Sequence, residues 1–428
     1  MTPDPPSPSP SALPPAALVR RLGTFDAVVL GLGAMIGAGV FAAFAPAAQA
    51  AGSGLLIGLA VAAVVAYCNA TSSARLAALY PESGGTYVYG RRRLGDFWGY
   101  HAGWSFVVGK TASCAAMALT FASYAAPGQR RLVGAVAVVA LTAVNYFGVQ
   151  KSVWLTRVIV TLTLTILTVV VIASLAGGSA SPGNLSPFPG TGVGGVLQAA
   201  GLLFFAFAGY ARIATLGEEV RDPAHTIPRA IPIALAITLA VYAIVGVSAL
   251  LAAGAEGLAR TTSPLRAAVQ AGTLSDLRPI VQVGGAIAAL GSLLALILGV
   301  SRTTLAMARD HHLPKVLASV HPRYQVPHRA EIAVGAVVLI LVVTVDLRGA
   351  IGFSSFGVLT YYAIANAAAL TLNRQEHRSP RWVPTLGLAG CVVLAFSLPA
   401  ASIVTGTGVL LLGAAIWAGR RIRRLTIA

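Results

Sequence analysis

Two apolar stretches interrupted by glycine decide how this chain folds. The first reads Gly31-Leu-Gly-Ala-Met-Ile-Gly-Ala-Gly-Val-Phe41, and the second reads Phe204-Phe-Ala-Phe-Ala-Gly-Tyr-Ala-Arg-Ile-Ala214. Glycine lowers helix propensity by about 1 kcal/mol relative to alanine, so both helices are expected to loosen near Gly37 and Gly209. Loosened backbone is tolerated inside a bilayer only where it lines a protected cavity. Two such breaks indicate a binding site at mid-membrane, and close helix packing through small residues is the alternative for each stretch alone.

The composition identifies the class of protein around these two stretches. The chain has 428 residues, of which 56% are hydrophobic and only 10% are charged, with a mean hydropathy of +0.79. Soluble chains carry about 25% charged residues, and apolar runs of about 20 residues are long enough to cross a bilayer. We predict an all-α polytopic membrane protein with twelve transmembrane helices, at 26–49, 54–79, 97–125, 131–147, 153–176, 195–217, 229–252, 278–304, 330–346, 350–371, 384–400 and 402–418.

The formal charge of +17 sets the orientation of these spans. With both termini in the cytoplasm, 22 of the 30 Lys and Arg residues lie inside, as the positive-inside rule requires. The basic residues are distributed between spans and form no single soluble face, so nucleic acid is not expected as a partner. We predict a multi-pass protein of the cytoplasmic membrane, whose partner is the lipid bilayer.

Three segments between spans lie on the cytoplasmic side in this orientation. They are residues 80–96, 218–229 and 302–329, and each carries several charges. These charges form either solvated loop surface or an inner gate. The three cysteines, at 68, 114 and 391, are isolated in apolar runs and have neither metal-ligand nor disulfide spacing, so no metal and no cofactor are expected.

Four blocks of sequence carry a resemblance to a known family. They are Gly33-Ala-Met-Ile-Gly-Ala-Gly-Val-Phe41, Tyr80-Pro-Glu-Ser-Gly-Gly-Thr-Tyr-Val-Tyr89, Phe204–Tyr210 with Glu218-Glu-Val-Arg-Asp-Pro223, and Ser301-Arg302 with Met307-Ala-Arg-Asp310. In this order and spacing they resemble the amino acid–polyamine–organocation permeases. The resemblance implies a five-plus-five inverted-repeat core at 22–372 and two extra helices at 373–418. The proline-rich composition of residues 1–21 predicts a disordered cytoplasmic tail, and the arginine cluster at 419–428 predicts a basic cytoplasmic tail.

The resemblance also implies how a substrate is held. An amino acid's carboxylate is expected on the backbone amides of Gly37, Ala38 and Gly39. Its ammonium is expected on the carbonyls of Met35, Phe205 and Ala208. Free amides and carbonyls at helix interruptions suit these two charges, and the small residues supply the room. Phe41, Phe205 and Tyr210 either cover the substrate or serve as packing aromatics.

Lys110 and Arg212 are basic side chains inside predicted spans, where a charge costs roughly 3 kcal/mol and marks a functional site by default. Lys110 lies four residues before Cys114, so both share one helix face. The resemblance to the permease family implies that this face is directed toward the substrate. Lys110 either holds an anionic group of the substrate or binds the coupling proton; a structural lysine satisfied by carbonyls is the alternative. Several members of the family carry a proton-coupling lysine where this chain has Thr163. If Lys110 binds the coupling proton, it takes the place of that missing lysine from a different helix.

The second basic side chain, Arg212, stays charged and therefore carries no proton. It is expected to pair with Glu82 or Glu219 in an inner gate, or to meet a substrate carboxylate. Relatives often carry an acidic residue where this chain has Ala211, and no acidic residue lies near either break. A cationic substrate is therefore disfavoured.

These observations predict a secondary active amino acid transporter that takes up a neutral amino acid with a proton by alternating access. An exchanger, and a transporter of an anionic amino acid or a related carboxylate, are the alternatives; a channel is a remote one. The chain is expected to work as a monomer or homodimer. No enzyme is expected, because the carboxylates are scattered and the seven histidines form no His-Glu-x-x-His pattern.

Overall fold

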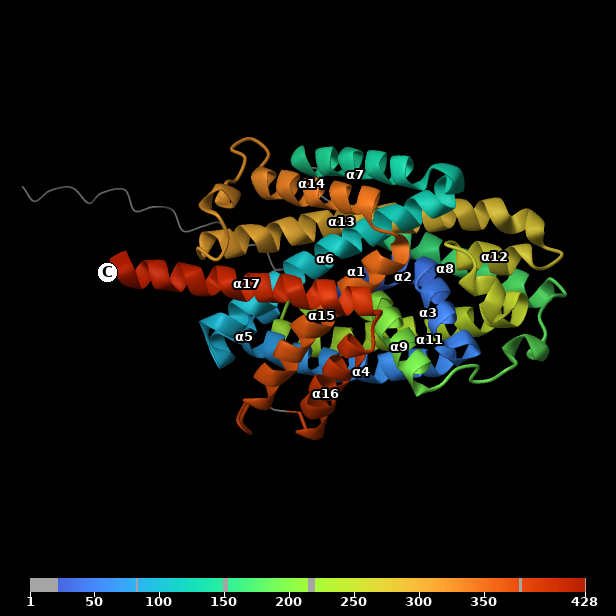
Figure 1. Ribbon diagram of the computed structural model, residues 1–428, viewed down its shortest axis with the longest axis horizontal. Coiled ribbons are helices and arrows are strands. Elements are labelled where there is room, and N and C mark those ends of the chain that lie inside the picture. The colour runs from blue at the N-terminus through green and yellow to red at the C-terminus, as the bar shows by residue number, and fades with distance from the viewer. Residues whose placement is uncertain (1–21, 82–83, 149–152, 215–219, 377–378, 428) are drawn as a thin grey trace, which may run out of the picture.

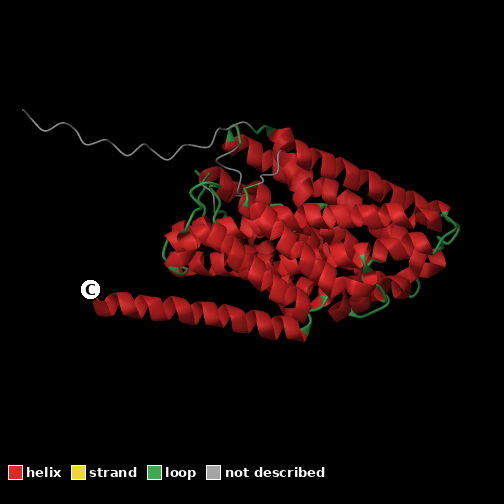
Figure 2. Cartoon of the chain, turned by 90° about the horizontal axis from the view of Figure 1, so that it is seen from above, coloured by secondary structure: helices red, strands yellow, loops and turns green. Residues whose placement is uncertain are grey.

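The structure is a computed structural model that describes residues 22–81, 84–148, 153–214, 220–376 and 379–427. Throughout these residues the chain is a bundle of helices (Figures 1 and 2). The helices are α1 (Thr24–Met35), α2 (Ala38–Ala42), α3 (Phe44–Ala51), α4 (Leu55–Leu79), α5 (Thr86–Leu94), α6 (Asp96–Ala125), α7 (Arg130–Tyr146), α8 (Val153–Ala176), α9 (Val193–Phe207), α10 (Ala211–Ala214), α11 (Pro223–Ala259), α12 (Pro264–Gln270), α13 (Arg278–Arg309), α14 (His328–Thr344), α15 (Leu347–Leu370), α16 (Trp382–Phe396) and α17 (Ala400–Ile427).

Eight helical segments of the described chain are long and apolar enough to cross a membrane. They are Thr24–Ala42, Phe44–Leu79, Asp96–Ala125, Val153–Ala176, Pro223–Ala259, Ser275–Arg309, Leu347–Leu370 and Ala400–Ile422. The apolar helices α9 and α16 are shorter, with 15 residues each. Every predicted span range contains a helix, so the chain is an integral membrane protein; twelve crossings and an inverted repeat stay predictions.

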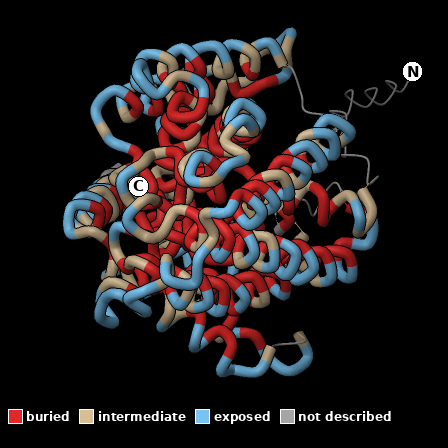
Figure 3. Tube along the Cα trace, turned by 90° about the vertical axis from the view of Figure 1, so that its right-hand side faces the viewer, coloured by how far each residue is buried: buried red, intermediate tan, exposed pale blue. Residues whose placement is uncertain are grey.

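The core of the bundle is packed mainly with small and aliphatic side chains from most of its helices, the broken ones included. The buried residues lie in the interior and the exposed ones outside (Figure 3). Met35 is 1% exposed, and Ala38 and Phe41 are 0% exposed. Side chains such as Val404 and Leu411 on α17 are exposed instead, and α17 runs along one edge of the bundle with its C-terminal end projecting beyond it (Figure 2). The first broken segment therefore lies in the interior of the bundle.

Both predicted breaks are present. Helix α1 ends at Met35, and a new helix begins at Ala38 after Gly37, whose φ and ψ are −130° and −134°. Helix α9 ends at Phe207, and three turn residues precede the short helix α10. Leu22 and Val220 form an isolated parallel bridge, with the Arg221 amide 2.8 Å from the Leu22 carbonyl oxygen. The bridge joins the segments before α1 and after α10.

The structure differs from the sequence-based prediction at two connections. Residues 80–96 were expected as a loop, but they contain helix α5, bounded by Gly85 and Gly95 at φ values of 57° and 100°. These left-handed values favour glycine, so the two glycines start and stop this helix sharply. The second difference is helix α12, which begins at Pro264 in a segment predicted only as a connection. Proline at a first helical turn is tolerated because its missing amide has no partner there.

Candidate functional site: the meeting of two broken helices

The two breaks lie directly against each other. A Cβ atom added at Gly39 would lie 2.7 Å from the Cα atom of Ala206, and one added at Gly209 would meet the carbonyl group of Ala34. Separations this short are possible only without a side chain, so both glycines are needed for the backbones to approach. Gly39 and Gly209 therefore interrupt their helices and also allow the two halves of the predicted site to come into contact.

The Met35 carbonyl oxygen at the first break accepts hydrogen bonds from two donors. The Gly37 amide donates to the Met35 oxygen at 2.9 Å, and the Tyr242 hydroxyl from α11 donates to the same oxygen at 2.6 Å. The Tyr242 hydroxyl also lies 3.0 Å from the carbonyl oxygen of Ala206 on α9. Tyr242 is 1% exposed, so it ties together the two broken segments from within the core.

Lys110 reaches the second break. Its Nζ atom donates to the carbonyl oxygen of Ala208 at 3.0 Å, and the residue is 7% exposed. Helix α6 packs closely on α15 here, because Gly109 and Gly357 bring their backbones together. Cys114 lies one helical turn beyond Lys110 and is fully buried. The lysine is thus held in the interior with its ammonium at the interrupted end of α9.

Three predicted aromatics are buried in defined contacts. The carbonyl oxygen of Phe41 accepts from the Tyr124 hydroxyl at 2.9 Å, and the two rings meet edge to face at 5.5 Å. Tyr210 stacks on Tyr362 with ring centroids 4.9 Å apart. Phe205, one turn before Gly209, is 7% exposed. These contacts are those of packing aromatics in this conformation, and their role as covers stays a prediction.

The remaining predicted residues are placed only in part. Thr163 is 1% exposed on α8, and its hydroxyl donates to the Ile159 carbonyl oxygen at 2.7 Å. It shares a helix face with Val160, whose side chain would lie 3.2 Å from a Cβ atom added at Gly33 on α1. Arg212 lies on α10 and is partly buried. Glu82 and Glu219 lie outside the described residues, so the predicted ion pairs with Arg212 stay predictions.

Sequence reasoning missed Tyr242 and Tyr124, the hydroxyl donors at the breaks. A tyrosine in an apolar helix is a usual packing residue, and only the fold reveals which carbonyl its hydroxyl reaches. It also missed Ser292 on α13, whose hydroxyl lies where a Cβ atom of Gly37 would fall. The described residues contain no group of His, Cys, Asp and Glu side chains able to hold a metal ion.

A buried amide network lies beside Tyr362, whose carbonyl oxygen accepts from the Asn366 side-chain amide at 3.0 Å. The side-chain amide nitrogen of Asn366 donates to Oδ1 of Asn69 at 2.6 Å, and its oxygen accepts from the Ser72 hydroxyl at 2.7 Å. The Cys391 thiol donates to the same Asn69 oxygen at 3.3 Å. All of these side chains are at most 1% exposed, so the network joins α4, α15 and α16 without water contact.

A second network lies at the end of the bundle that holds α5. The Tyr87 hydroxyl lies 2.6 Å from Oδ2 of Asp310 and 2.8 Å from Nδ1 of His312. Nη1 of Arg91 donates to the same Asp310 oxygen at 2.6 Å. Oδ2 of Asp96, at the start of α6, lies 3.3 Å from Nε2 of His312. Trp417 on α17 also donates to that Asp96 oxygen, so the network ties the C-terminal helix to α5 and α6.

His312 makes this second network sensitive to pH. Burial lowers the pKa of the His312 ring, and the neighbouring Asp96 opposes the shift without reversing it. Arg91 adds to the lowering, and Asp310 opposes it. The packed conformation therefore prefers a neutral ring, so its stability is full above the ordinary histidine pKa of about 6.5 and is lost as pH falls through the lowered value.

We expect the unfolding temperature of the protein to fall between pH 6.5 and pH 5, and to fall less steeply in His312→Gln. Thermal unfolding followed by intrinsic fluorescence at several pH values measures both slopes. His225→Gln is the matched control, because that histidine side chain is exposed. Equal slopes for wild type and His312→Gln would contradict the assignment of the pH sensitivity to His312.

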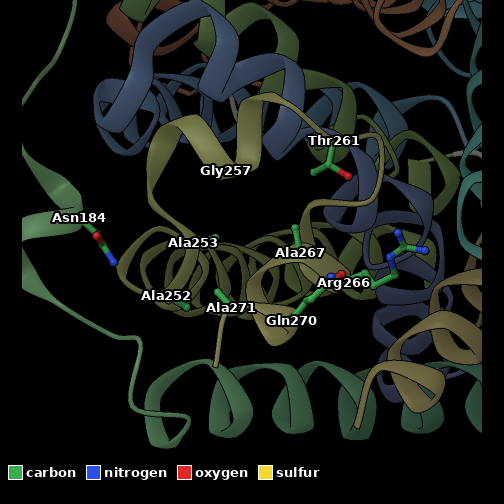
Figure 4. A pocket seen from close by; sticks show the side chains of 9 residues that line it. All are labelled: Asn184, Ala252, Ala253, Gly257, Thr261, Arg266, Ala267, Gln270 and Ala271. Atoms are coloured by element: carbon green, nitrogen blue, oxygen red, sulfur yellow. The ribbon is translucent and has the colours of Figure 1, made fainter. Parts of the chain in front are cut away.

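A pocket of about 440 Å³ lies apart from the breaks (Figure 4). Asn184 stands on one side of it, and Arg266 and Gln270 of α12 stand on another. The full lining is Asn184, Ala252, Ala253, Gly257, Thr261, Arg266, Ala267, Gln270 and Ala271. None of the predicted substrate residues belongs to it, so this pocket is distinct from the meeting point of the broken helices.

A family model described as amino acid permease matches residues 22–418. The chain belongs to the amino acid permease family. The predicted resemblance to the amino acid–polyamine–organocation superfamily is confirmed, and the four sequence blocks lie within the matched permease residues.

Relatives of this permease are transporters. It is 67% identical to an "uncharacterized transporter" of Mycobacterium tuberculosis, over 95% of this chain and 93% of the relative. It is 28% identical to a branched-chain amino acid permease of Bacillus subtilis, over 94% and 93% of the two chains. It is also 28% identical to a methylthioribose transporter of Bacillus subtilis, over 90% and 89%. The family and these relatives make the permease a membrane transporter.

Proposed function

We propose that this permease is a secondary active transporter that carries an amino acid or a related small carboxylate by alternating access. The observation that carries the proposal is the contact of the two broken helices, made through Gly39 and Gly209 and closed by Tyr242. A cavity that opens between two such breaks exposes backbone groups to one side of the membrane at a time. The buried state of the site corresponds to a closed stage of such a cycle.

Proton coupling through Lys110 is part of the proposal. The buried ammonium of Lys110 donates a hydrogen bond to the Ala208 carbonyl at the end of α9. Loss of its proton removes a charge from the interior, so protonation of Lys110 can be coupled to the opening and closing of the break. Thr163 has no ionisable group, so it cannot take this role. Uptake with a proton is the predicted mode, and exchange without a proton is the alternative.

The substrate class follows from the acid–base character of the breaks and from the relatives. Neither broken stretch, 31–41 or 204–214, contains an Asp or Glu residue, so neither supplies a counter-ion for a cationic substrate. A neutral amino acid and a related carboxylate both fit this description. The methylthioribose transporter shows by its name that the family is not restricted to amino acids.

Uptake into proteoliposomes tests the proposal. We expect the purified permease to accumulate at least one labelled amino acid or amino acid-derived carboxylate from a panel, and an imposed inward pH gradient to increase the accumulation. Protein-free liposomes and a pH gradient collapsed by an ionophore are the controls. No transport of any member of the panel would contradict the function, and transport indifferent to the gradient would contradict proton coupling.

A further inference from the structure

The pocket of Figure 4 is formed where α11 is interrupted and the chain turns back into α12. Gly254, near the end of α11, has φ and ψ values of 67° and 168°. A positive φ favours glycine, so Gly254 lets the chain leave the helical path at this point. Asn184 is held on the opposite wall, because its side-chain amide nitrogen donates to the Leu251 carbonyl oxygen at 2.6 Å. The pocket therefore belongs to the fold, and α12 places it at the end of the bundle opposite α5 (Figure 1).

Two polar side chains of α12 line this pocket without a partner from the protein. They are the half-buried Arg266 and the exposed Gln270. Within the described residues, neither side chain takes part in an ion pair or a hydrogen bond. Other arginines at this end are engaged, since Arg260 pairs with a carboxylate and Arg278 donates to a backbone carbonyl oxygen. The donors and the charge of Arg266 are thus left for a ligand in the pocket.

The spacing of these two side chains matches the two charged groups of an amino acid. Arg266 and Gln270 are four residues apart, so they lie one turn apart on the same face of α12. A guanidinium binds a carboxylate through two parallel hydrogen bonds, and a glutamine oxygen accepts from an ammonium. The carboxylate and the ammonium of an α-amino acid are attached to one carbon atom, so both reach this pair at once.

The remaining walls leave room for a side chain. Most of them are made of residues that fill little space, namely Ala252, Ala253, Gly257, Ala267 and Ala271. The volume of about 440 Å³ lies within the range of about 300–1,000 Å³ that is usual for small-molecule pockets, and an inorganic anion would leave most of it unfilled. We propose that this pocket is a second binding site, separate from the breaks, which holds the carboxylate of a free α-amino acid on Arg266 and its ammonium on Gln270.

Helix α12 connects this pocket to the first break. Its inner face is packed in the core, where Leu265, Ala268 and Val269 are 0% exposed. The Tyr124 hydroxyl, which donates to the Phe41 oxygen at 2.9 Å, also interacts with backbone amides in the first turn of α12. An amino acid held between α11 and α12 favours this packed arrangement, so it slows any cycle in which α2 and α12 move apart. This effect on transport rests on the proposed function, whereas the binding itself does not.

A cysteine placed in the pocket tests the binding. Ala271 is exposed and lines the pocket, and the three native cysteines are 0% exposed, so Ala271→Cys gives purified permease one accessible thiol. We expect at least one of the twenty common amino acids, added singly, to slow labelling by a small thiol-specific reagent by at least about ten-fold. The same compound with a carboxamide in place of its carboxylate, and sodium sulfate, are expected to leave the rate unchanged. Gln375→Cys, exposed and outside the pocket, is the control that no amino acid protects.

A second substitution shows whether Arg266 is responsible. Arg266→Gln, made together with Ala271→Cys, is expected to raise the amino acid concentration needed for half-protection by at least about ten-fold. Arg278→Gln is the matched control, because Arg278 is an exposed arginine at the same end that does not line the pocket, and it is expected to retain protection. If Arg266→Gln does not yield folded protein, the comparison of the amino acid with its carboxamide decides.

Uptake in proteoliposomes tests the effect on transport. With a transported amino acid we expect the initial rate of wild type to fall at high concentration, and the rate of Arg266→Gln to rise to a plateau. Rate curves of the same shape would overturn the effect on the cycle.

The outcomes separate this inference from the proposed function. The second site is overturned if no amino acid protects the thiol in Ala271→Cys, if the carboxamide or sulfate protects it equally, or if Arg266→Gln leaves protection unchanged. Absence of uptake for every member of the panel would instead overturn the proposed function, and protection of the thiol would still establish the binding site.

Discussion

Replacing Gly209 by alanine is expected to lower the transport rate by at least about ten-fold, because the added methyl group meets the Ala34 carbonyl and the Met35 amide. Backbone atoms cannot move aside as a flexible side chain does. Overpacking of this kind costs about 1–3 kcal/mol in a packed core, and here the cost falls on the closed state that joins the two breaks. The variant should therefore favour states in which α1 and α9 are separated.

Initial uptake rates in proteoliposomes, normalised to the amount of reconstituted protein, measure the effect of Gly209→Ala. Gly299→Ala is the matched control: it also adds one methyl group to a glycine, but no atom lies within 4 Å of the added carbon, and the site is inside helix α13. Alanine is the better helix former, so this control should keep full activity. Full activity in Gly209→Ala would show that the breaks need not touch during transport.

Replacing Asn366 by leucine is expected to destabilise the permease by about 2–4 kcal/mol, since a buried group left without its hydrogen bond costs about 1–3 kcal/mol. The substitution leaves both the Asn69 side chain and the Ser72 hydroxyl without the partner that now lies 2.6–2.7 Å away. These groups are buried between α4, α15 and α16, where water does not replace the partner. A lower unfolding temperature of the purified protein is the expected readout.

The control for Asn366→Leu is Asn373→Leu. Asn373 is exposed and its side chain accepts one hydrogen bond, from the Glu376 amide at 3.0 Å, so the change should lower the unfolding temperature much less. Surface substitutions of this kind usually alter stability by less than about 0.5 kcal/mol. Equal effects of the two substitutions would show that the buried network contributes nothing beyond an ordinary surface contact.

The sequence predicted the helices well because a bilayer-length apolar run leaves few structural options. The predicted range 153–176 coincides with α8, and 131–147 differs from α7 by one residue at each end. The sequence did not predict helix α5, whose arginines lower the apolar signal of a short segment. Its boundaries depend on the conformations of Gly85 and Gly95, which are fixed by the surrounding packing.

The sequence predicted the two backbone breaks of the candidate site. It did not predict which side chains form hydrogen bonds with the carbonyl groups at these breaks. Glycine and small residues marked both breaks, because backbone irregularity needs particular residues at particular positions. No local pattern indicates that Tyr242 donates to Met35, more than 200 residues away in the chain. The position of Lys110 in a span marked it as functional, but only the fold shows that its ammonium reaches the Ala208 oxygen.

Labelling of Cys114 in proteoliposomes tests the location of the substrate most directly. This native thiol is fully buried one turn from Lys110, and Cys68→Ser with Cys391→Ser leaves it as the only cysteine. A substrate that binds between the two breaks predicts slow labelling by a small thiol-specific reagent during turnover, and protection by a saturating, non-transported substrate analogue. If Cys114 is labelled at the same rate with and without that analogue, in protein that transports normally, the result would contradict a substrate site at the breaks.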